Sequence, residues 1–171
     1  MIRRATLLDA PALAALGRRT FVDAFGADNT AADLEAFLAS TYADELQRRE
    51  LLDDSRICLV AEHDGQLVAF ALLNTGKRSA FVSDPTALEL QRFYLDRSVQ
   101  GTGLAQALMA ACVDAARERG GKTLFLGVWE RNARALRFYA AQGFRQVGDQ
   151  IFHVGSDPQR DLVLARSLQP T

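Results

Sequence analysis

A mixed α/β fold is predicted by three observations on the sequence. Apolar runs of strand length alternate with segments in which apolar residues recur every three or four positions, as in amphipathic helices. Asp64-Gly65 separates two strand-like runs and is typical of a tight hairpin turn. The run 124–129 is apolar throughout, as expected of a strand buried on both faces of a sheet. No linker or internal repeat interrupts the 171 residues, so residues 1–171 are expected to form one domain.

The N-terminal third is predicted to be mostly helical. Asp9 before Ala10-Pro11 is N-cap chemistry with proline in the first turn. Apolar spacing then predicts a helix over 10–25, which Gly26 ends. The other elements expected here are a short strand over 2–6 and helices over 30–42 and 43–52.

Acidic side chains are unevenly distributed over these helices. Nine of them lie between residues 23 and 54, against two arginines. The pattern is typical of solvated helix faces. It also suits an acidic rim that attracts a cationic substrate.

The rest of the chain is predicted to alternate between strands and helices. Glycines end the helical patterns, at Gly120-Gly121 and again at Gly143. The expected elements are strands 56–62, 66–74 and 86–95, helix 103–119, strand 122–129, helix 132–142, and a final hairpin of strands 144–154 and 160–168.

Bulk properties exclude several classes of protein. A net charge of −1 argues against a general nucleic-acid binder, and no apolar run approaches the roughly 20 residues of a membrane helix. The N-terminal residues lack the apolar core of a signal peptide. Cys58 and Cys112 stand far apart in apolar settings, which favours buried thiols over a disulfide or a metal site. We therefore expect a cytoplasmic protein without metal, nucleic-acid or membrane partners.

A glycine-containing turn, residues 100–105, follows the predicted strand 86–95 and opens the next helix. Such a turn exposes backbone N–H groups at the positive end of a helix and is typical of an anion site. A dinucleotide fingerprint is disfavoured because Gln106 occupies the place of the third glycine. The Gly-Lys-Ser/Thr of a Walker loop is absent. A plain strand-to-helix turn that needs two glycines is the remaining alternative.

Two motifs together resemble a known family. Gln100-x-x-Gly103-x-Ala105 is similar to the pyrophosphate-binding signature of the GNAT superfamily of acetyl-CoA-dependent N-acetyltransferases. The second family motif is matched downstream, after the next strand, by Asn132-x-x-Ala135-x-x-Phe138-Tyr139-x-x-x-Gly143-Phe144. Shorter stretches resemble the bacterial PaiA-type branch, which is associated with polyamine acetylation: 20–30, 91–94, 126–129 and 157–162.

The resemblance implies a mostly antiparallel sheet with one splayed parallel strand pair and helices on both faces. It implies acetyl-CoA as co-substrate, with the pantetheine arm lying between the splayed strands. Asn132 would hydrogen-bond that arm, or cap the last helix, or both. The cofactor-binding residues implied are Phe93, Tyr94 and Leu95 on the strand, and Gln100, Gly101, Thr102, Gly103, Leu104 and Ala105 in the turn.

Two side chains are the catalytic candidates implied by the resemblance. Tyr139 occupies the family's tyrosine position and would protonate the departing thiolate. Without the motif, it would be interpreted as a core aromatic residue. Glu89 lies on the strand before the turn, where a carboxylate would take the amine proton through water; an exposed carboxylate without a role is the alternative. Alternation places Glu89 with Gln91, Phe93 and Leu95 on one face unless a bulge intervenes.

The expected reaction is acetylation of a primary amine by direct attack in a ternary complex. A polyamine or other small cationic amine is the first acceptor expected, from the PaiA-type resemblance. A protein or peptide N-acetyltransferase would use the same cofactor half. A CoA-binding regulatory module without catalysis is the alternative outside the enzyme class. The oligomeric state stays open, a homodimer included.

Overall fold

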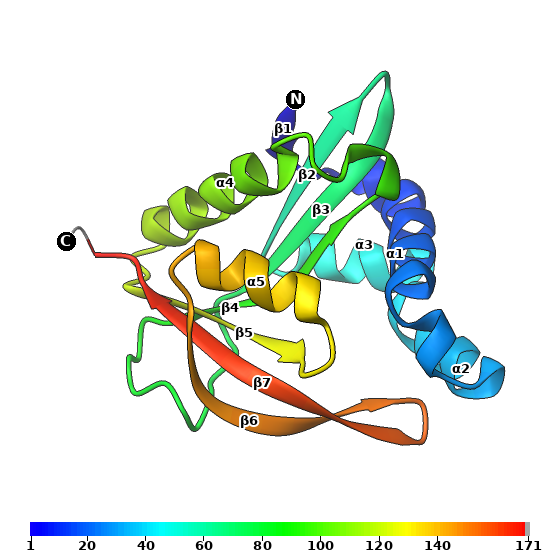
Figure 1. Ribbon diagram of the computed structural model, residues 1–171. Coiled ribbons are helices and arrows are strands. Elements are labelled where there is room, and N and C mark those ends of the chain that lie inside the picture. Colours follow the sequence, from blue (N-terminus) through cyan, green and yellow to red (C-terminus); the bar gives the residue numbers. More distant parts are fainter. Residues whose placement is uncertain (170–171) are drawn as a thin grey trace.

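A computed structural model describes residues 1–169 and contains one seven-stranded sheet flanked by helices (Figure 1). Neighbouring strands are antiparallel except for β4 and β5, which are parallel. The expected mixed, mostly antiparallel fold is therefore confirmed. In sheet order, the strands are β1 (Ile2–Arg4), β2 (Arg56–His63), β3 (Gln66–Asn74), β4 (Leu88–Leu95), β5 (Thr123–Trp129), β7 (Asp157–Ser167) and β6 (Arg145–Val154).

Helices cover both faces of the sheet, and each face has its own core. On one face, Leu108 and Cys112 of α4 pack with Leu124 and Leu126 of β5. On the other, residues of α1, α2 and α3 pack with Val60 and Phe70. The helices are α1 (Ala10–Phe25), α2 (Ala31–Thr41), α3 (Asp44–Leu52), α4 (Leu104–Glu118) and α5 (Ala133–Ala141), with 3-10 turns at Leu7–Asp9, Gly26–Asp28 and Arg97–Val99. None of the helices within residues 1–169 is long and apolar enough to cross a membrane.

Local sequence signals placed the element ends well. α1 begins directly after Asp9, with proline in its first turn, and α-helix gives way to a 3-10 turn at Gly26. The predicted hairpin turn has Asp64 at φ 51° and Gly65 at φ 74°, the left-handed pair that a two-residue turn of this kind requires. The predicted ends agree with the structure because helix capping and turn formation depend on residues only a few positions apart.

The parallel strands β4 and β5 separate soon after they meet. Their register contains only two Cα pairs, Leu88 with Leu124 and Glu89 with Phe125. β5 pairs with β7 along its whole length instead. A gap therefore opens in the middle of the sheet toward the C-terminal ends of β4 and β5.

A β-bulge in β4 changes which side chains face each layer. Leu72 and Leu73 of β3 pair with Arg92 and Leu90, so Gln91 has no register partner on β3. Beyond the bulge, Phe93 and Leu95 pack with the α4 core, and Tyr94 packs with the α1 core. The uninterrupted alternation from Glu89 to Leu95 does not hold, because the extra residue reverses the faces.

Candidate active site

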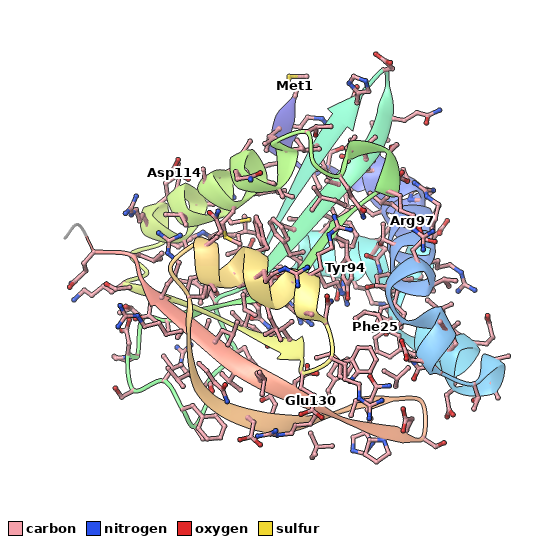
Figure 2. The ribbon with its side chains drawn as sticks, in the orientation of Figure 1. Met1, Phe25, Tyr94, Arg97, Asp114 and Glu130 are labelled. Atoms are coloured by element: carbon pink, nitrogen blue, oxygen red, sulfur yellow. The ribbon has the colours of Figure 1, made fainter. Side chains whose placement is uncertain are left out.

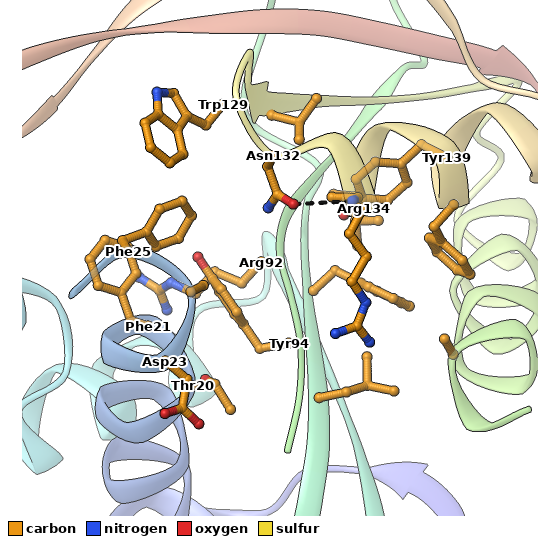
Figure 3. Close-up of a pocket in the computed structure, with 18 of the residues that line it drawn as sticks. Thr20, Phe21, Asp23, Phe25, Arg92, Tyr94, Trp129, Asn132, Arg134 and Tyr139 are labelled. Atoms are coloured by element: carbon orange, nitrogen blue, oxygen red, sulfur yellow. Dashed lines mark hydrogen bonds between the residues drawn. The ribbon is translucent and has the colours of Figure 1, made fainter. Parts of the chain in front are cut away.

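A cavity of about 620 Å³ occupies the gap between β4 and β5. Its walls come from both faces of the sheet, because the separated strands leave a passage between them. Figure 3 shows Asn132 and Tyr139 on the α5 side of the cavity and Phe21 and Phe25 on the α1 side, with Tyr94 between. Figure 2 marks Phe25 and Tyr94 in the whole molecule.

The turn before α4 forms one end of the cavity. Gly101 and Gly103 have φ values of 81° and 86°, a left-handed conformation that side chains rarely adopt, and Gly103 is the N-cap of α4. Within residues 1–169, the backbone N–H groups of residues 101–106 donate to no protein acceptor. These free donors stand at the positive end of a 15-residue helix, which is the chemistry of an anion site.

The predicted turn residues divide into two groups. Those that line the cavity are Gln100, Gly101, Gly103 and Ala105, together with Gln106, which was not predicted. Thr102 and Leu104 are not among the lining residues. The Thr102 hydroxyl donates to the Val99 carbonyl at 2.7 Å, which steadies the turn. Arg134 donates to the Gln100 side chain, so α5 and the turn are tied together.

The free edge of β4 forms the floor of the cavity. Phe93, Tyr94 and Leu95 all line it, and on their other side they pair with β3. A strand has hydrogen-bonding groups on both edges, so the edge that β5 leaves uncovered can bind an extended chain. The Phe93 ring stacks on Phe138 of α5, with ring centroids 5.6 Å apart.

Asn132 caps α5 and also lines the cavity. The Ala135 backbone N–H donates to its Oδ1 at 3.1 Å, drawn as a dashed line in Figure 3. The capping role that the sequence predicts is therefore confirmed. The side-chain amide nitrogen donates to no acceptor within the described part of the chain. A contact of Asn132 with the pantetheine arm stays a prediction.

Tyr139 is buried among aromatic rings, yet it borders the cavity. The rings of Phe93, Phe138 and Phe144 surround it, with centroids 5.5 to 6.3 Å away. Burial raises the pKa of Tyr139 above the ordinary value of 10, so the phenol stays protonated at neutral pH. Its hydroxyl makes no hydrogen bond to residues 1–169 and is free for a ligand.

Glu89 lies at the point where β4 and β5 part, paired with Phe125. Burial raises the pKa of its carboxyl above the ordinary value, and Lys77, Arg56 and Arg92 oppose that shift. Glu89 is not among the residues that line the cavity. Action through water, as the sequence predicts, stays a prediction.

The acidic helices contribute little to the cavity, because most of their carboxylates have partners. Glu50 binds Arg92, with 3.0 Å between Arg92 Nη2 and Glu50 Oε1, and Glu35 binds Arg18 at 3.2 Å. Of the acids between residues 23 and 54, only Asp23 lines the cavity. Its Oδ2 lies 3.4 Å from Nε of Arg97, so this carboxylate also has a partner.

Several residues of the α1 side were missed by sequence reasoning. One is Asp161 of β7, a buried carboxylate bordering the cavity. Its sequence signal is an acid that alternates with Val163 and Ala165 on one face of β7. The aromatic members of this wall are Phe21, Phe25, Trp129 and Phe152.

Comparison with known proteins places the chain in a family. The acetyltransferase (GNAT) family model matches residues 20–144. An uncharacterized N-acetyltransferase of Lactobacillus delbrueckii subsp. lactis is 32% identical over 160 residues, which cover 94% of this chain and 92% of that protein. The spermine/spermidine N(1)-acetyltransferase of Bacillus subtilis is 26% identical over 133 residues, covering 74% and 88%.

A solved structure shares the whole architecture. The PaiA N-acetyltransferase of Thermoplasma acidophilum, crystallised in complex with coenzyme A, superposes with a TM-score of 0.78 over 98% of both chains at 18% identity. The likeness extends from β1 to β7, so it includes the parallel strands that part around the cavity. With the family match over residues 20–144, the chain belongs to the acetyltransferase (GNAT) family.

Proposed function

We propose that this protein transfers the acetyl group of acetyl-CoA to a primary amine, by direct attack of the amine in a ternary complex. The observation that carries the proposal is the cavity between β4 and β5. It joins the free N–H groups before α4 to Tyr139 on one face and to an aromatic wall on the other. Such a passage lets two substrates approach from opposite faces of the sheet.

The residues around the cavity fit an anionic cofactor with a long neutral arm. The N–H groups of residues 101–106 would bind the pyrophosphate. The free edge of β4, from Phe93 to Leu95, would bind the amides of the arm, with the Asn132 amide adding a donor. When bound, acetyl-CoA supplies the acetyl group as a thioester. One backbone N–H of β4 would stabilise negative charge on the carbonyl oxygen.

Two proton movements are assigned to side chains. Tyr139, held protonated by burial, would donate its hydroxyl proton to the departing sulfur. An alkyl amine with a pKa of about 10.4 arrives mostly protonated and must lose a proton before it attacks. Glu89 would receive that proton through water, since it lies at the parting of β4 and β5 and outside the cavity wall.

A small cationic amine, such as a polyamine, is the proposed acceptor class. One resemblance supports it, the spermine/spermidine N(1)-acetyltransferase of B. subtilis, which is 26% identical over 74% of this chain. The acidic helices do not add support, because their carboxylates are largely paired.

The test combines cofactor binding with thiol release. Calorimetry should show that the protein binds CoA, and free thiol should appear when acetyl-CoA is mixed with spermidine or 1,4-diaminobutane. Amino acids and N-terminal peptides complete the panel. Failure to bind CoA would refute the proposal. Binding without thiol release on any amine would identify a CoA-binding module, and release on peptides alone would change the acceptor class.

A further inference from the structure

Asp161 is a buried polar residue that differs from the others in the described core. Thr20, Gln47, Asn74 and Gln159 are each at most 9% exposed, and each side chain makes a hydrogen bond to protein. Asp161 is 7% exposed, yet its carboxylate has no hydrogen bond or ion pair with any residue among 1–169. An unpaired buried carboxylate is costly, so such a group ordinarily has a partner.

The carboxylate of Asp161 is accessible from the cavity because its neighbour has no side chain. Gly127 of β5 borders the cavity beside it. A Cβ on Gly127 would lie 3.2 Å from Asp161 Oδ2 and 3.1 Å from Gln150 Nε2. Any larger residue would therefore crowd the carboxylate. The glycine leaves the oxygen open to a ligand.

Aromatic rings surround the approach to Asp161. Trp129 is its register partner on β5, and the Trp129 and Phe25 ring centroids are 5.8 Å apart. Phe21 lies 4.6 Å from Phe25, and Phe152 lines the same cavity. Aromatic faces attract cations and accept alkyl chains. A carboxylate among such faces suits an alkylammonium ion, whereas a neutral or anionic ligand would leave its charge uncompensated.

We propose that Asp161 binds a cationic nitrogen of the acceptor, and that Trp129 and Phe25 hold the alkyl chain attached to it. The inference rests on the proposed function, whose acceptor class it deepens. It makes Asp161 the residue that selects cationic acceptors over neutral ones. The cationic nitrogen is either the one that is acetylated or a second one on the same molecule, and the two cases respond differently to substitution.

Binding can be measured without turnover because Trp129 is the only tryptophan in the chain. Its fluorescence is followed while 1,4-diaminobutane, n-butylamine or 1-butanol is added to the CoA-saturated protein. Asp161→Asn is compared with Asp149→Asn, which removes the same charge from an exposed β6 carboxylate paired with Arg160 outside the cavity. CoA affinity, measured in parallel, shows that both variants are folded.

Asp161→Asn should weaken binding of 1,4-diaminobutane by about 10- to 100-fold, the range for loss of a hydrogen bond to a charged group. Asp149→Asn should change it by less than about twofold. Binding of 1-butanol should not respond to either substitution. If binding of n-butylamine weakens as much as binding of the diamine, Asp161 holds the nitrogen that is acetylated. If only binding of the diamine weakens, Asp161 holds the second nitrogen.

An unchanged affinity of Asp161→Asn for both amines would overturn the inference. The proposed function fails separately, when the wild-type protein binds CoA and amines but releases no thiol from acetyl-CoA. Steady-state kinetics give the matching readout. The KM for the diamine should rise in Asp161→Asn, while the KM for acetyl-CoA stays constant.

Discussion

The carboxylate of Asp33 accepts two hydrogen bonds from Ser156, one from the backbone N–H and one from the hydroxyl, both at 2.7 Å. Asp33 lies in the first turn of α2, and Ser156 lies in the turn between β6 and β7. These bonds hold the pKa of Asp33 below its ordinary value. They fasten the β6–β7 hairpin, which carries the cavity residues Phe152 and Asp161, to α2.

Asp33→Ala should therefore loosen the acceptor side and leave the cofactor side intact. We expect a KM for the amine several-fold higher, on the order of 1 kcal/mol of binding, with CoA affinity unchanged. Steady-state kinetics measure the KM for the amine, and calorimetry measures the CoA affinity. Glu35→Ala is the matched control, since Glu35 lies on the same helix and, among residues 1–169, pairs only with Arg18 at the surface. Equal effects of the two variants would contradict the role of the Asp33–Ser156 contact.

Tyr139→Phe should slow turnover without weakening acetyl-CoA binding. The ring and its aromatic packing remain, and only the hydroxyl proton is lost. We expect kcat to fall about 100-fold, the lower end for general acid catalysis. Stopped-flow thiol release measures it. Equal turnover of the variant and the wild type would contradict the proposed role of Tyr139 as the acid that protonates the departing sulfur.

Glu89→Gln separates the proposed base from the proposed cation-binding residue. A base acts on the chemical step, so kcat should fall by about 100-fold while the amine KM stays near the wild-type value. Burial raises the pKa of Glu89, and the base must be ionised, so wild-type kcat should rise as pH rises through that raised pKa. A variant with wild-type kcat and pH profile would assign Glu89 no part in catalysis.

Gly103→Ala tests the turn before α4. A side chain at φ 86° is strained, and about 1–2 kcal/mol of unfolding free energy should be lost. CoA affinity should fall as well, because the free N–H groups follow from this backbone conformation. Gly120→Ala, at φ 77° beyond the other end of α4, should lose similar stability and keep CoA affinity. Chemical denaturation and calorimetry compare them; unchanged CoA affinity in Gly103→Ala would contradict the cofactor site.

Asp161→Asn should stabilise the free protein at neutral pH. Burial raises the pKa of Asp161 from 3.8 to about 6, so the folded state binds more protons than the unfolded state between those values. Stability is therefore lost as pH rises through this window, and the loss is complete above about pH 6. Asp161→Asn has no charge to bury and avoids this loss of stability. Its free energy of unfolding at pH 7 should exceed that of the wild type by on the order of 1–2 kcal/mol.

Denaturation of the same variant at pH 4 provides the internal control for this effect. There the wild-type carboxyl is protonated in the fold, and the difference between the two proteins should nearly vanish. A constant difference at both pH values would show that burial of this carboxylate has no cost.

What could be predicted from the sequence is what depends on neighbours along the chain. Proline after Asp9, the Asp64-Gly65 turn and the glycines before α4 each act within a few residues, so the elements that they begin or join were predictable. The bulge at Gln91 was not, because it is defined by the pairing of β4 with β3.

Asp161 shows the same limit at the candidate site. Its position depends on β7 lying beside β5, and its access to the cavity depends on Gly127, which is 34 residues away in sequence. Neither relationship is encoded in a local pattern. The proposed cofactor half of the candidate site is carried by two local motifs, whereas the proposed acceptor half is assembled from α1, β5 and the β6–β7 hairpin.

Acetyl transfer to an amine is tested most directly by following the acetyl group itself. Acetyl-CoA labelled with ¹³C in the acetyl carbonyl is incubated with the protein and 1,4-diaminobutane, and the products are identified by NMR and mass spectrometry. We predict that the label appears in the amide carbonyl of N-acetyl-1,4-diaminobutane as free CoA forms. Label that remains in acetyl-CoA or appears only as acetate, across all amines of the panel, would contradict the account.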